Sequence, residues 1–418
     1  MPENLKPRQS AVRILSRVLN DKKTVDAAIF EEKDYSSYAD SDRHFIKLLV
    51  LTTLRRLGQI DTVLNKALQK PLPQKQQIIH QILRLALAQY LFLDVPPYAV
   101  LNTSVSLTRR FHRDGLSGLV NGVLRHITRL KKPLESADNP VLNIPDWLFS
   151  SWDQAYGTTI ARQIAESVLD QPPLDISVLS DPETWAGRWN GFVLPTGSIR
   201  VPITNPVDLP GFYENAWVQN ASAAIPAMLL TDIKGKQVAD LCAAPGGKTL
   251  QLVARGAFVT AVDLSENRLK RLRENIHRLH LEKSVQVITS DVMDLPEDKL
   301  FDAVLLDAPC SATGTLTRHP ELKYHRQSID INRLSELQKS LLSKALSLLK
   351  PNGELVFSTC SLQPQEGDFV ISDILDKATV IPPTEDCFKP YLTPFGSLRI
   401  FPLNGFDGFY ICRLRKKV

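Results

Sequence analysis

The stretch QVADLCAAPGGKTLQLVARGAFVTAVD, residues 237–263, gives the clearest indication of the fold class. Its first and last parts, QVADLCA and FVTAVD, are short apolar runs typical of buried strands, and KTLQLVA between them has helical spacing. A strand, a helix and a second strand in this order form a βαβ unit, in which the two strands are parallel. The stretch therefore predicts a parallel sheet with helices packed on its faces.

The same alternation continues to the end of the chain. Further helices are expected at ENRLKRLRENIHRL and INRLSELQKSLLSKALSLL, and further strands at VQVITSD, FDAVLLD and ELVFST. The tail SLRIFPLNGFDGFYICRLRKK contains two strand-like runs joined around Asn404-Gly405, which favours an antiparallel pair. We predict an α/β domain over 211–418, with a mostly parallel sheet and an antiparallel C-terminal strand.

Two other regions precede this domain. From Arg8 to about Arg129 apolar residues recur every three or four positions, with proline breaks at 70–73 and 94–97, so we predict an all-α bundle over 1–133. Between 134 and 210 the helical period is lost, and LDISVLSD and FVLPTGSIRVP are strand-like. This region is predicted to be a small α+β connector.

Composition limits the possible functions. Hydrophobic residues make up 43% and charged residues 23%, which is typical of a globular protein, and no apolar run reaches the roughly 18 residues that a membrane span needs. The N-terminus has no secretory pattern, so we expect a cytoplasmic location. We also expect a monomer with no membrane partner. The five cysteines include no C-x-x-C pair, which argues against a disulfide framework and against a zinc or other metal site.

The turn DLCAAPGGKT, residues 240–249, indicates a ligand site between the first strand and the first helix. Its glycines allow a ligand to approach the backbone, and the helix N-terminus offers unpaired N–H groups. A phosphate-binding Walker loop would need glycine where Cys242 stands, and a dinucleotide fingerprint would need G-x-G-x-x-G. Both motifs are absent.

Two acids follow the next strands. Asp263 lies 17 residues after Gly246 and ends the second strand, where an acid can hold a ribose diol, and Asp291 ends the third strand. Each acid alone is equally compatible with a helix cap. Together with the turn they suit a nucleoside without phosphates, because no cluster of cations is offered to pyrophosphate. S-adenosylmethionine meets that description.

Two cysteines end the fourth and fifth strands, in Asp307-Ala308-Pro309-Cys310 and Thr359-Cys360. Both are expected at the carboxyl edge of the sheet, where ligands of open α/β sheets bind. Cys242, Cys387 and Cys412 are instead expected to be small buried hydrophobes. A thiolate that adds to carbon 6 of cytosine activates carbon 5 toward a methyl donor, an acid such as Asp307 can assist at ring nitrogen 3, and a second thiol can assist release. Spacing alone does not say which cysteine attacks.

Four segments, DLCAAPGGKT, AVDLSENRLKRLRENIHRL, LLDAPCSATGTLTRHPEL and FSTCSLQPQEGD, resemble the RNA 5-methylcytosine methyltransferases. With the helical N-terminal region, nearly the whole chain resembles the bacterial 16S ribosomal RNA (cytosine-5)-methyltransferase B family, also called Fmu or Sun. The bundle resembles NusB, an RNA-binding fold. The resemblance implies a Rossmann-like class I methyltransferase domain, S-adenosylmethionine as cofactor and RNA, above all 16S rRNA, as partner.

The resemblance also implies roles for single residues. The nucleophile would be Cys360 and the cysteine that assists product release would be Cys310, with Asp307 in the same pocket. The residues expected to hold the methyl donor are Cys242, Ala243, Ala244, Pro245, Gly246, Gly247, Lys248, Asp263, Arg268, Asp291 and Asp307.

RNA contacts are expected in the most basic stretch of the chain and in the family's R-H-P segment. The residues concerned are Arg109, Arg110, Arg113, Arg125, Arg318 and His319. The alternatives are a solvated helix face for the arginines and a loop cap for the R-H-P segment. Three other functions stay open: a transfer-RNA methyltransferase, a non-catalytic RNA-binding adaptor, and an oxidoreductase, which the missing dinucleotide fingerprint disfavours.

Overall fold

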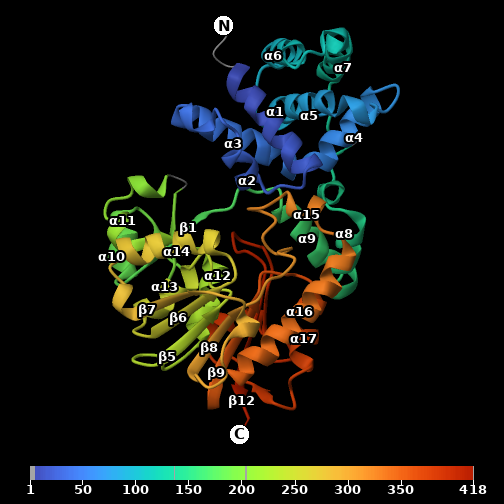
Figure 1. Ribbon diagram of the computed structural model, residues 1–418. Helices are drawn as coiled ribbons and strands as arrows, with labels where there is room; N and C mark the ends of the chain where they lie inside the picture. Colours follow the sequence, from blue (N-terminus) through green and yellow to red (C-terminus); the bar gives the residue numbers. More distant parts are fainter. Residues whose placement is uncertain (1–4, 136, 203–204, 418) are drawn as a thin grey trace. The chain divides into compact units, whose positions relative to one another are not determined.

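The computed structural model describes residues 5–135, 137–202 and 205–417 (Figure 1). Their contacts divide them into two units. The first unit contains the described residues up to Asp170 and a later segment, Leu316–Gln327. The second unit contains the described residues of Gln171–Thr315 and those from Ser328 onward. The chain therefore changes unit after Asp170, which differs from the boundaries at 133 and 210 that the sequence suggested.

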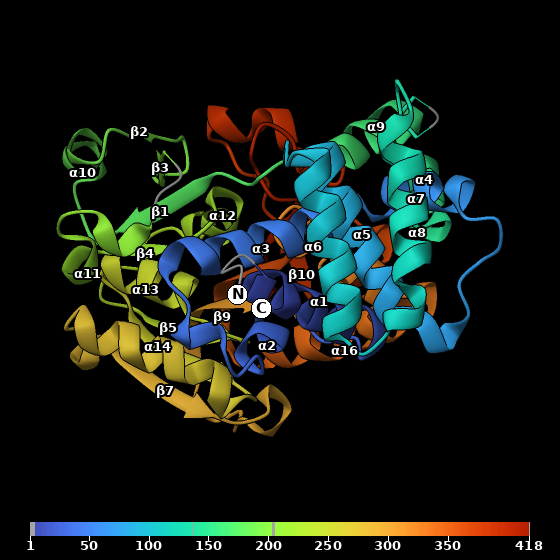
Figure 2. The same cartoon turned by 90° about the horizontal axis from the view of Figure 1, so that it is seen from above.

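The first unit is helical, as predicted (Figure 2). Helix α5 is central because it packs against α1, α3, α4, α6 and α7, and its consecutive residues 85–88, which point to different sides, are all buried. The predicted breaks are confirmed, since prolines separate α4 from α5 and α5 from α6. The helices before residue 170 are α1 Leu5–Asn20, α2 Val25–Phe30, α3 Asp40–Arg55, α4 Leu57–Ala67, α5 Gln77–Phe92, α6 Pro97–Arg110, α7 Ser117–Arg129, α8 Asp146–Tyr156 and α9 Thr158–Ser167.

Helices α8 and α9 explain why the boundary lies later than expected. The 3-10 helix η4, Pro140–Asn143, packs against both α4 and α9. Asn143 donates to the side-chain oxygen of Gln59 at 3.0 Å, and Gln59 donates to the carbonyl of Ala137 at 2.9 Å. Gly58 allows this approach, because a side chain there would overlap the carbonyl of Leu142. Buried hydrogen bonds therefore join this region to the bundle.

The segment Leu316–Gln327, which we call the inserted segment, also packs within the first unit. It contains the short helix α15, Leu322–His325. Arg55 on α3 donates to the carbonyl of Thr317 at 2.8 Å, and the ammonium group of Lys323 donates to the carbonyl of Arg55 at 3.2 Å. Burial, with Arg55 nearby, lowers the pKa of Lys323 well below its ordinary value. The segment is thus held by buried hydrogen bonds.

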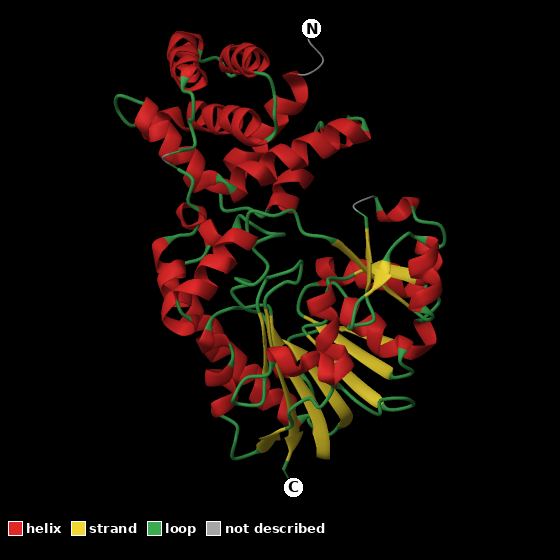
Figure 3. Ribbon diagram, turned by 180° about the vertical axis from the view of Figure 1, so that it is seen from behind, coloured by secondary structure: helices red, strands yellow, loops and turns green. Residues whose placement is uncertain are grey.

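The second unit is built on a sheet with the strand order β10-β12-β9-β8-β5-β6-β7, and β11 pairs with β12 (Figure 3). Strands β7, β6, β5, β8 and β9 are parallel neighbours, whereas β12 is antiparallel to β9. This confirms the predicted sheet with its antiparallel C-terminal strand. The strands are β5 Gln237–Leu241, β6 Phe258–Asp263, β7 Val285–Thr289, β8 Phe301–Asp307, β9 Leu349–Thr359, β10 Ala378–Val380, β11 Leu398–Ile400 and β12 Phe409–Lys416.

Helices cover both faces of this sheet, as its apolar strands require. Val238 of β5 belongs to a core that includes residues of α12, α13 and α14, and its neighbour Ala239 belongs to a core that includes residues of α16 and α17. Alternate residues of one strand therefore serve opposite faces. The helices are α12 Ala221–Leu229, α13 Gly247–Ala254, α14 Glu266–Arg278, α16 Ser328–Ser347 and α17 Asp368–Ser372.

A smaller antiparallel sheet begins the second unit, in the order β2-β3-β1-β4. The predicted strand-like runs are confirmed, but the sheet extends past 210 because β4 pairs with β1. Asp175 of β1 binds Arg200 at 2.7 Å and accepts from the backbone of Ala221 at 3.1 Å. The strands are β1 Leu174–Val178, β2 Phe192–Val193, β3 Ile199–Val201 and β4 Ala216–Val218.

In the described residues no helix is long and apolar enough to cross a membrane.

Candidate active site

Two cysteines meet at the carboxyl edge of the sheet. Strands β8 and β9 are parallel neighbours in which Asp307 is paired with Ser358, so the loops that follow them start side by side. The sulfur atoms of Cys310 and Cys360 are 3.3 Å apart, and both side chains are partly buried. The sequence predicted that these thiols share one edge, and the structure shows them in contact.

The two thiols differ in their electrostatic surroundings. The hydrogen bond with Cys360, together with burial, raises the pKa of Cys310 well above its ordinary value. Cys310 therefore keeps its proton in this pair. Burial raises the pKa of Cys242 to about 12 and also raises the pKa of Cys412, which favours the protonated thiol in both. Cys412 is buried as predicted, whereas Cys242 is only partly buried.

Asp307, at the end of β8, is held on both of its oxygens. One oxygen lies 2.7 Å from the ammonium group of Lys248, and the other accepts from the hydroxyl of Ser358 at 2.7 Å. Burial opposes the charge on Lys248, but the neighbouring Asp307 raises its pKa overall. Lys248 is therefore a charged partner of Asp307. The resemblance implied that Lys248 also contacts the methyl donor, and that role stays a prediction.

The glycine turn runs from Cys242 to the start of α13. Gly246 has a φ of +107°, and a side chain there would overlap Leu272 of α14. The backbone N–H of Ala244 donates to Asp263 at 3.1 Å, and Arg268 donates to the carbonyl of Ala244 at 2.5 Å. The end of β6 and the start of α14 therefore fix the shape of the turn.

The two predicted acids occupy neighbouring strand ends. Asp263 is 3% exposed and also accepts from the backbone of Ser265 at 2.9 Å. Asp291 caps a short 3-10 helix by accepting from the backbone of Met293 at 2.9 Å. Asp291 thus has the capping role that the sequence left as an alternative, whereas Asp263 joins the glycine turn to the residues that precede α14. Each acid retains oxygen lone pairs for a further donor.

Three residues at this edge were missed by the sequence analysis. Leu264, which directly follows Asp263, is 72% exposed although it is apolar. Met293, two residues after Asp291, is also apolar and is 44% exposed. Asp240, at the end of β5, is fully buried, and burial raises its pKa to about 7. Exposure and burial of single side chains have no signature in the sequence, so the strand ends alone were the available signal.

Four of the six predicted RNA-contacting residues, with Arg129 of the same basic stretch, lie on helices α6 and α7 or directly after α6. Arg109 and Arg110 end α6, and Arg113 follows it. Arg125 and Arg129 lie on α7, which packs against α6. All five are exposed, and we call them the basic surface.

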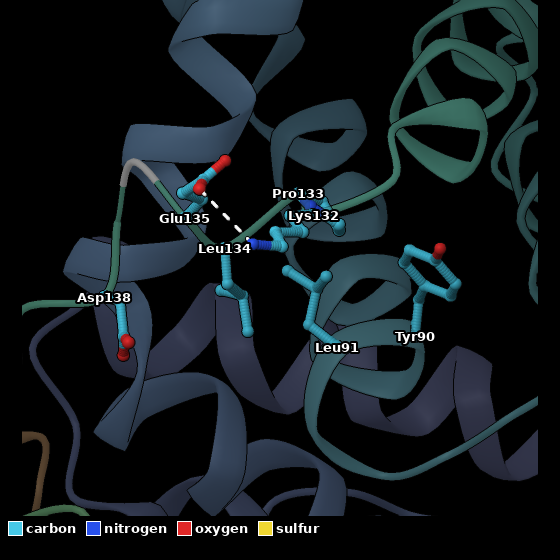
Figure 4. Close-up of a pocket in the computed structure, with 7 residues that line it drawn as sticks. All are labelled: Tyr90, Leu91, Lys132, Pro133, Leu134, Glu135 and Asp138. Atoms are coloured by element: carbon cyan, nitrogen blue, oxygen red, sulfur yellow. Dashed lines mark ion pairs between the residues drawn. The ribbon is translucent and has the colours of Figure 1, made fainter.

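Two hollows of the first unit lie next to helix α7 or the chain that follows it. One has a volume of about 920 Å³ and is lined by residues 66–73 and by α7 from Gly118 to His126. The other, of about 660 Å³, is shown in Figure 4, where Lys132 and Glu135 form an ion pair at 3.6 Å. Neither hollow contains any of the predicted catalytic residues.

The R-H-P segment has a different position from the basic surface. Arg318 and His319 belong to the inserted segment. His319 lies 3.7 Å from the carboxylate of Glu321, and that carboxylate accepts from the backbone of Val25 at 3.3 Å. The hydrogen bond between Glu321 and Val25 resembles the loop-cap alternative, while the His319 ring remains about half exposed.

Comparison with known proteins gives consistent matches. A family model described as 16S rRNA methyltransferase RsmB/F matches residues 227–415, and a NusB family model matches residues 5–129. The ribosomal RNA small subunit methyltransferase B of Yersinia pestis is 34% identical, with 98% of each chain covered. The protein of the same name from Salmonella paratyphi B is 36% identical, with 81% of this chain and 83% of that one covered.

Solved structures show the same fold. The crystal structure of PH0851 is 24% identical, has a TM-score of 0.78 and covers 97% of this chain and 98% of its own. A methyltransferase homologue from Pyrococcus horikoshii is 32% identical with a TM-score of 0.56, covering 64% of this chain and 94% of its own. The Rossmann-like prediction and the NusB-like prediction are therefore confirmed.

Proposed function

Because the chain belongs to the 16S rRNA methyltransferase RsmB/F family, we propose that it transfers a methyl group from S-adenosylmethionine to carbon 5 of a cytosine in 16S ribosomal RNA. The observation that carries this proposal is the contact between Cys310 and Cys360, whose sulfurs are 3.3 Å apart. Methylation at carbon 5 needs one sulfur that bonds to the ring. A second thiol within reach of that sulfur can assist its departure from the ring, which supports the proposal.

The residues at the edge of the sheet fit the methyl donor. S-adenosylmethionine supplies an electrophilic methyl group when it is bound. We propose that Asp263 accepts from the ribose hydroxyls, because each of its oxygens has one backbone donor and a further lone pair. The exposed side chains of Leu264 and Met293 would pack against the adenine. Gly246 would allow the ligand to approach the backbone.

Cys360 is the proposed nucleophile. Its neighbour Cys310 is the weaker candidate, because the hydrogen bond with Cys360 and burial raise the pKa of Cys310 well above its ordinary value. The Cys360 thiolate adds to carbon 6 of the cytosine, and carbon 5 becomes the nucleophile that takes the methyl group. Asp307, held by Lys248 and Ser358, would accept a hydrogen bond from ring nitrogen 3 once that nitrogen takes up a proton as the adduct forms.

Cys310 is proposed to assist the release of the product. After methyl transfer a base removes the proton from carbon 5, the ring double bond forms again, and the bond between carbon 6 and sulfur breaks. Negative charge then returns to the sulfur of Cys360. The thiol of Cys310, 3.3 Å away, can donate a hydrogen bond to that sulfur as the charge appears.

The test uses the full-length protein with methyl-labelled S-adenosylmethionine and either 16S ribosomal RNA or transfer RNA. Digested RNA is analysed by mass spectrometry for 5-methylcytidine. We expect product in ribosomal RNA with the natural chain and no product with Cys360→Ala. Cys387 is partly buried and packs against the hydrophobic core, so Cys387→Ala is expected to keep full activity. Product from Cys360→Ala at the natural rate would refute the assignment, and product in transfer RNA alone would replace the proposed substrate.

A further inference from the structure

Glu366 is a buried carboxylate that the proposed reaction does not use. It ends the 3-10 helix η8, Pro364–Glu366, six residues after Cys360. It is 0% exposed. A buried carboxylate is costly unless every oxygen is hydrogen-bonded, so its partners indicate why it is there.

Both oxygens of Glu366 hold the residues that follow the two cysteines. One oxygen accepts from the backbone N–H of Ser311 at 2.8 Å and from the amide of Gln338 on α16 at 3.0 Å. The other accepts from the hydroxyl of Ser361 at 2.5 Å and from the hydroxyl of Ser311. Ser311 follows Cys310, and Ser361 follows Cys360. A single carboxylate therefore joins the two loops.

The residues that precede the cysteines are held by the same group. The backbone carbonyl of Glu366 accepts from the hydroxyl of Thr359 at 2.9 Å. Gln338, which donates to Glu366, also donates to the carbonyl of Pro309 at 2.9 Å. Directly or through Gln338, Glu366 thus contacts the residues on both sides of each cysteine. Gln338 is also fully buried, so these hydrogen bonds are shielded from solvent.

We propose that Glu366 is the positioning residue of the cysteine pair, setting the distance between the Cys310 and Cys360 sulfurs; its role in methylation rests on the proposed function. The geometry of a carboxylate suits this task, because two oxygens accept four donors from three different segments of the chain. Glutamine would keep one accepting oxygen and would present an amide N–H₂ group to the two serine hydroxyls. Leucine would remove the acceptor that these four donors share.

The first test measures the distance between the thiols without RNA or methyl donor. Diamide accepts two protons and two electrons from a pair of thiols, which form a disulfide only if the sulfurs can meet. The rate of the Cys310–Cys360 disulfide is followed by peptide mass spectrometry in the full-length protein. Because misplacement by about 1 Å costs on the order of 10²-fold in rate, Glu366→Leu should slow the disulfide about 10²-fold and Glu366→Gln about tenfold.

Asp368 provides a matched control two residues further on. Its carboxylate accepts from Ser397 at 2.9 Å and from Tyr410 at 2.6 Å, and these partners lie on or beside β11 and β12 rather than in the cysteine loops. Asp368→Asn should loosen the same segment and leave the disulfide rate unchanged. A slowing as large as that of Glu366→Gln would overturn the proposal, because the effect would then be general loosening.

The remaining outcomes are decisive in the same way. If a folded Glu366→Leu or Glu366→Gln protein forms the disulfide at the natural rate, the proposal is wrong; if Glu366→Leu does not fold, Glu366→Gln decides alone. A second readout is the lifetime of the covalent RNA adduct, which should lengthen in Glu366→Gln. Failure of the natural chain to methylate RNA, with the disulfide rates as expected, would refute the proposed function and leave the positioning role intact.

Discussion

Replacing Cys310 by alanine is expected to trap the protein on its RNA. The substitution removes a partly buried thiol that lies 3.3 Å from the sulfur of Cys360 and leaves that sulfur free to attack. Addition to the cytosine and methyl transfer should still occur. Departure of the sulfur should slow, because the returning negative charge has no hydrogen-bond donor from this side chain.

The size of the effect follows from this one interaction. A hydrogen bond to a charged group is worth about 1.5 to 3 kcal/mol. Each 1.36 kcal/mol of transition-state stabilisation is a factor of about ten in rate. Release from Cys310→Ala should therefore be about 10- to 150-fold slower than release from the natural chain. Cys310→Ser retains a hydroxyl donor and should release at an intermediate rate.

The assay is a single-turnover time course with an excess of protein over RNA. Samples are quenched in denaturant, and the covalent complex is read as a shifted band on a denaturing gel, while methylated cytosine is measured in parallel. We expect methyl transfer at a near-natural rate and a band that persists. A Cys310→Ala protein that releases RNA as fast as the natural chain would refute the role of this thiol, and one that forms no band with RNA and methyl donor would refute the assignment of Cys360.

Three further predictions concern other parts of the chain. Reversing the charge of Arg109, Arg110 and Arg113 should weaken RNA binding. The slope of log binding constant against log salt concentration, measured by titrations at several salt concentrations, should become shallower by about 0.7 to 0.9 for each RNA phosphate that the variant no longer neutralises. An unchanged slope would mean that these side chains form only a solvated face. Gly246→Ala should destabilise the fold by about 1 to 3 kcal/mol in denaturant unfolding, because φ is +107° and Leu272 fills the space, whereas Gly118→Ala, which has open space, should not; equal stability of the two variants would contradict this. The pKa of Asp240 is about 7 in the folded chain and lies above its unfolded value, so the contribution of Asp240 to stability falls as pH rises from about 4 to 7. Asp240→Asn should remove this fall, which melting temperatures measured over that pH range would show. Identical dependence of the melting temperature on pH in the natural chain and the variant would disprove this prediction.

The sequence predicted most of the sheet and the meeting of the two thiols. That was possible because the carboxyl ends of adjacent parallel strands share an edge, so the strand that precedes Cys310 and the strand that precedes Cys360 place their loops together. Glycines and acids at the same edge gave the predicted donor side for the same reason.

What escaped prediction depends on interactions between distant residues. The carboxylate of Glu366 lies in a sequence that resembles an ordinary helix start, and only the folded chain brings Ser311 within reach of it. Leu264 and Met293 are ordinary apolar residues in the sequence, and their exposure depends on what the neighbouring elements leave uncovered. For the R-H-P segment the sequence left RNA contact and a loop cap open, and the hydrogen bond between Val25 and the nearby Glu321 could not be foreseen because the two residues are far apart in the sequence.

The inserted segment also limits how the chain can be divided. The polypeptide passes from one unit to the other after residues 170, 315 and 327, so no single cut separates them. A fragment that starts at Gln171 would retain Lys323 and Glu321 but lack Arg55 and Val25, and would expose groups that are 1% and 0% accessible in the intact chain. The helical bundle is therefore not a detachable accessory. It completes the fold of a stretch that begins six residues after Cys310.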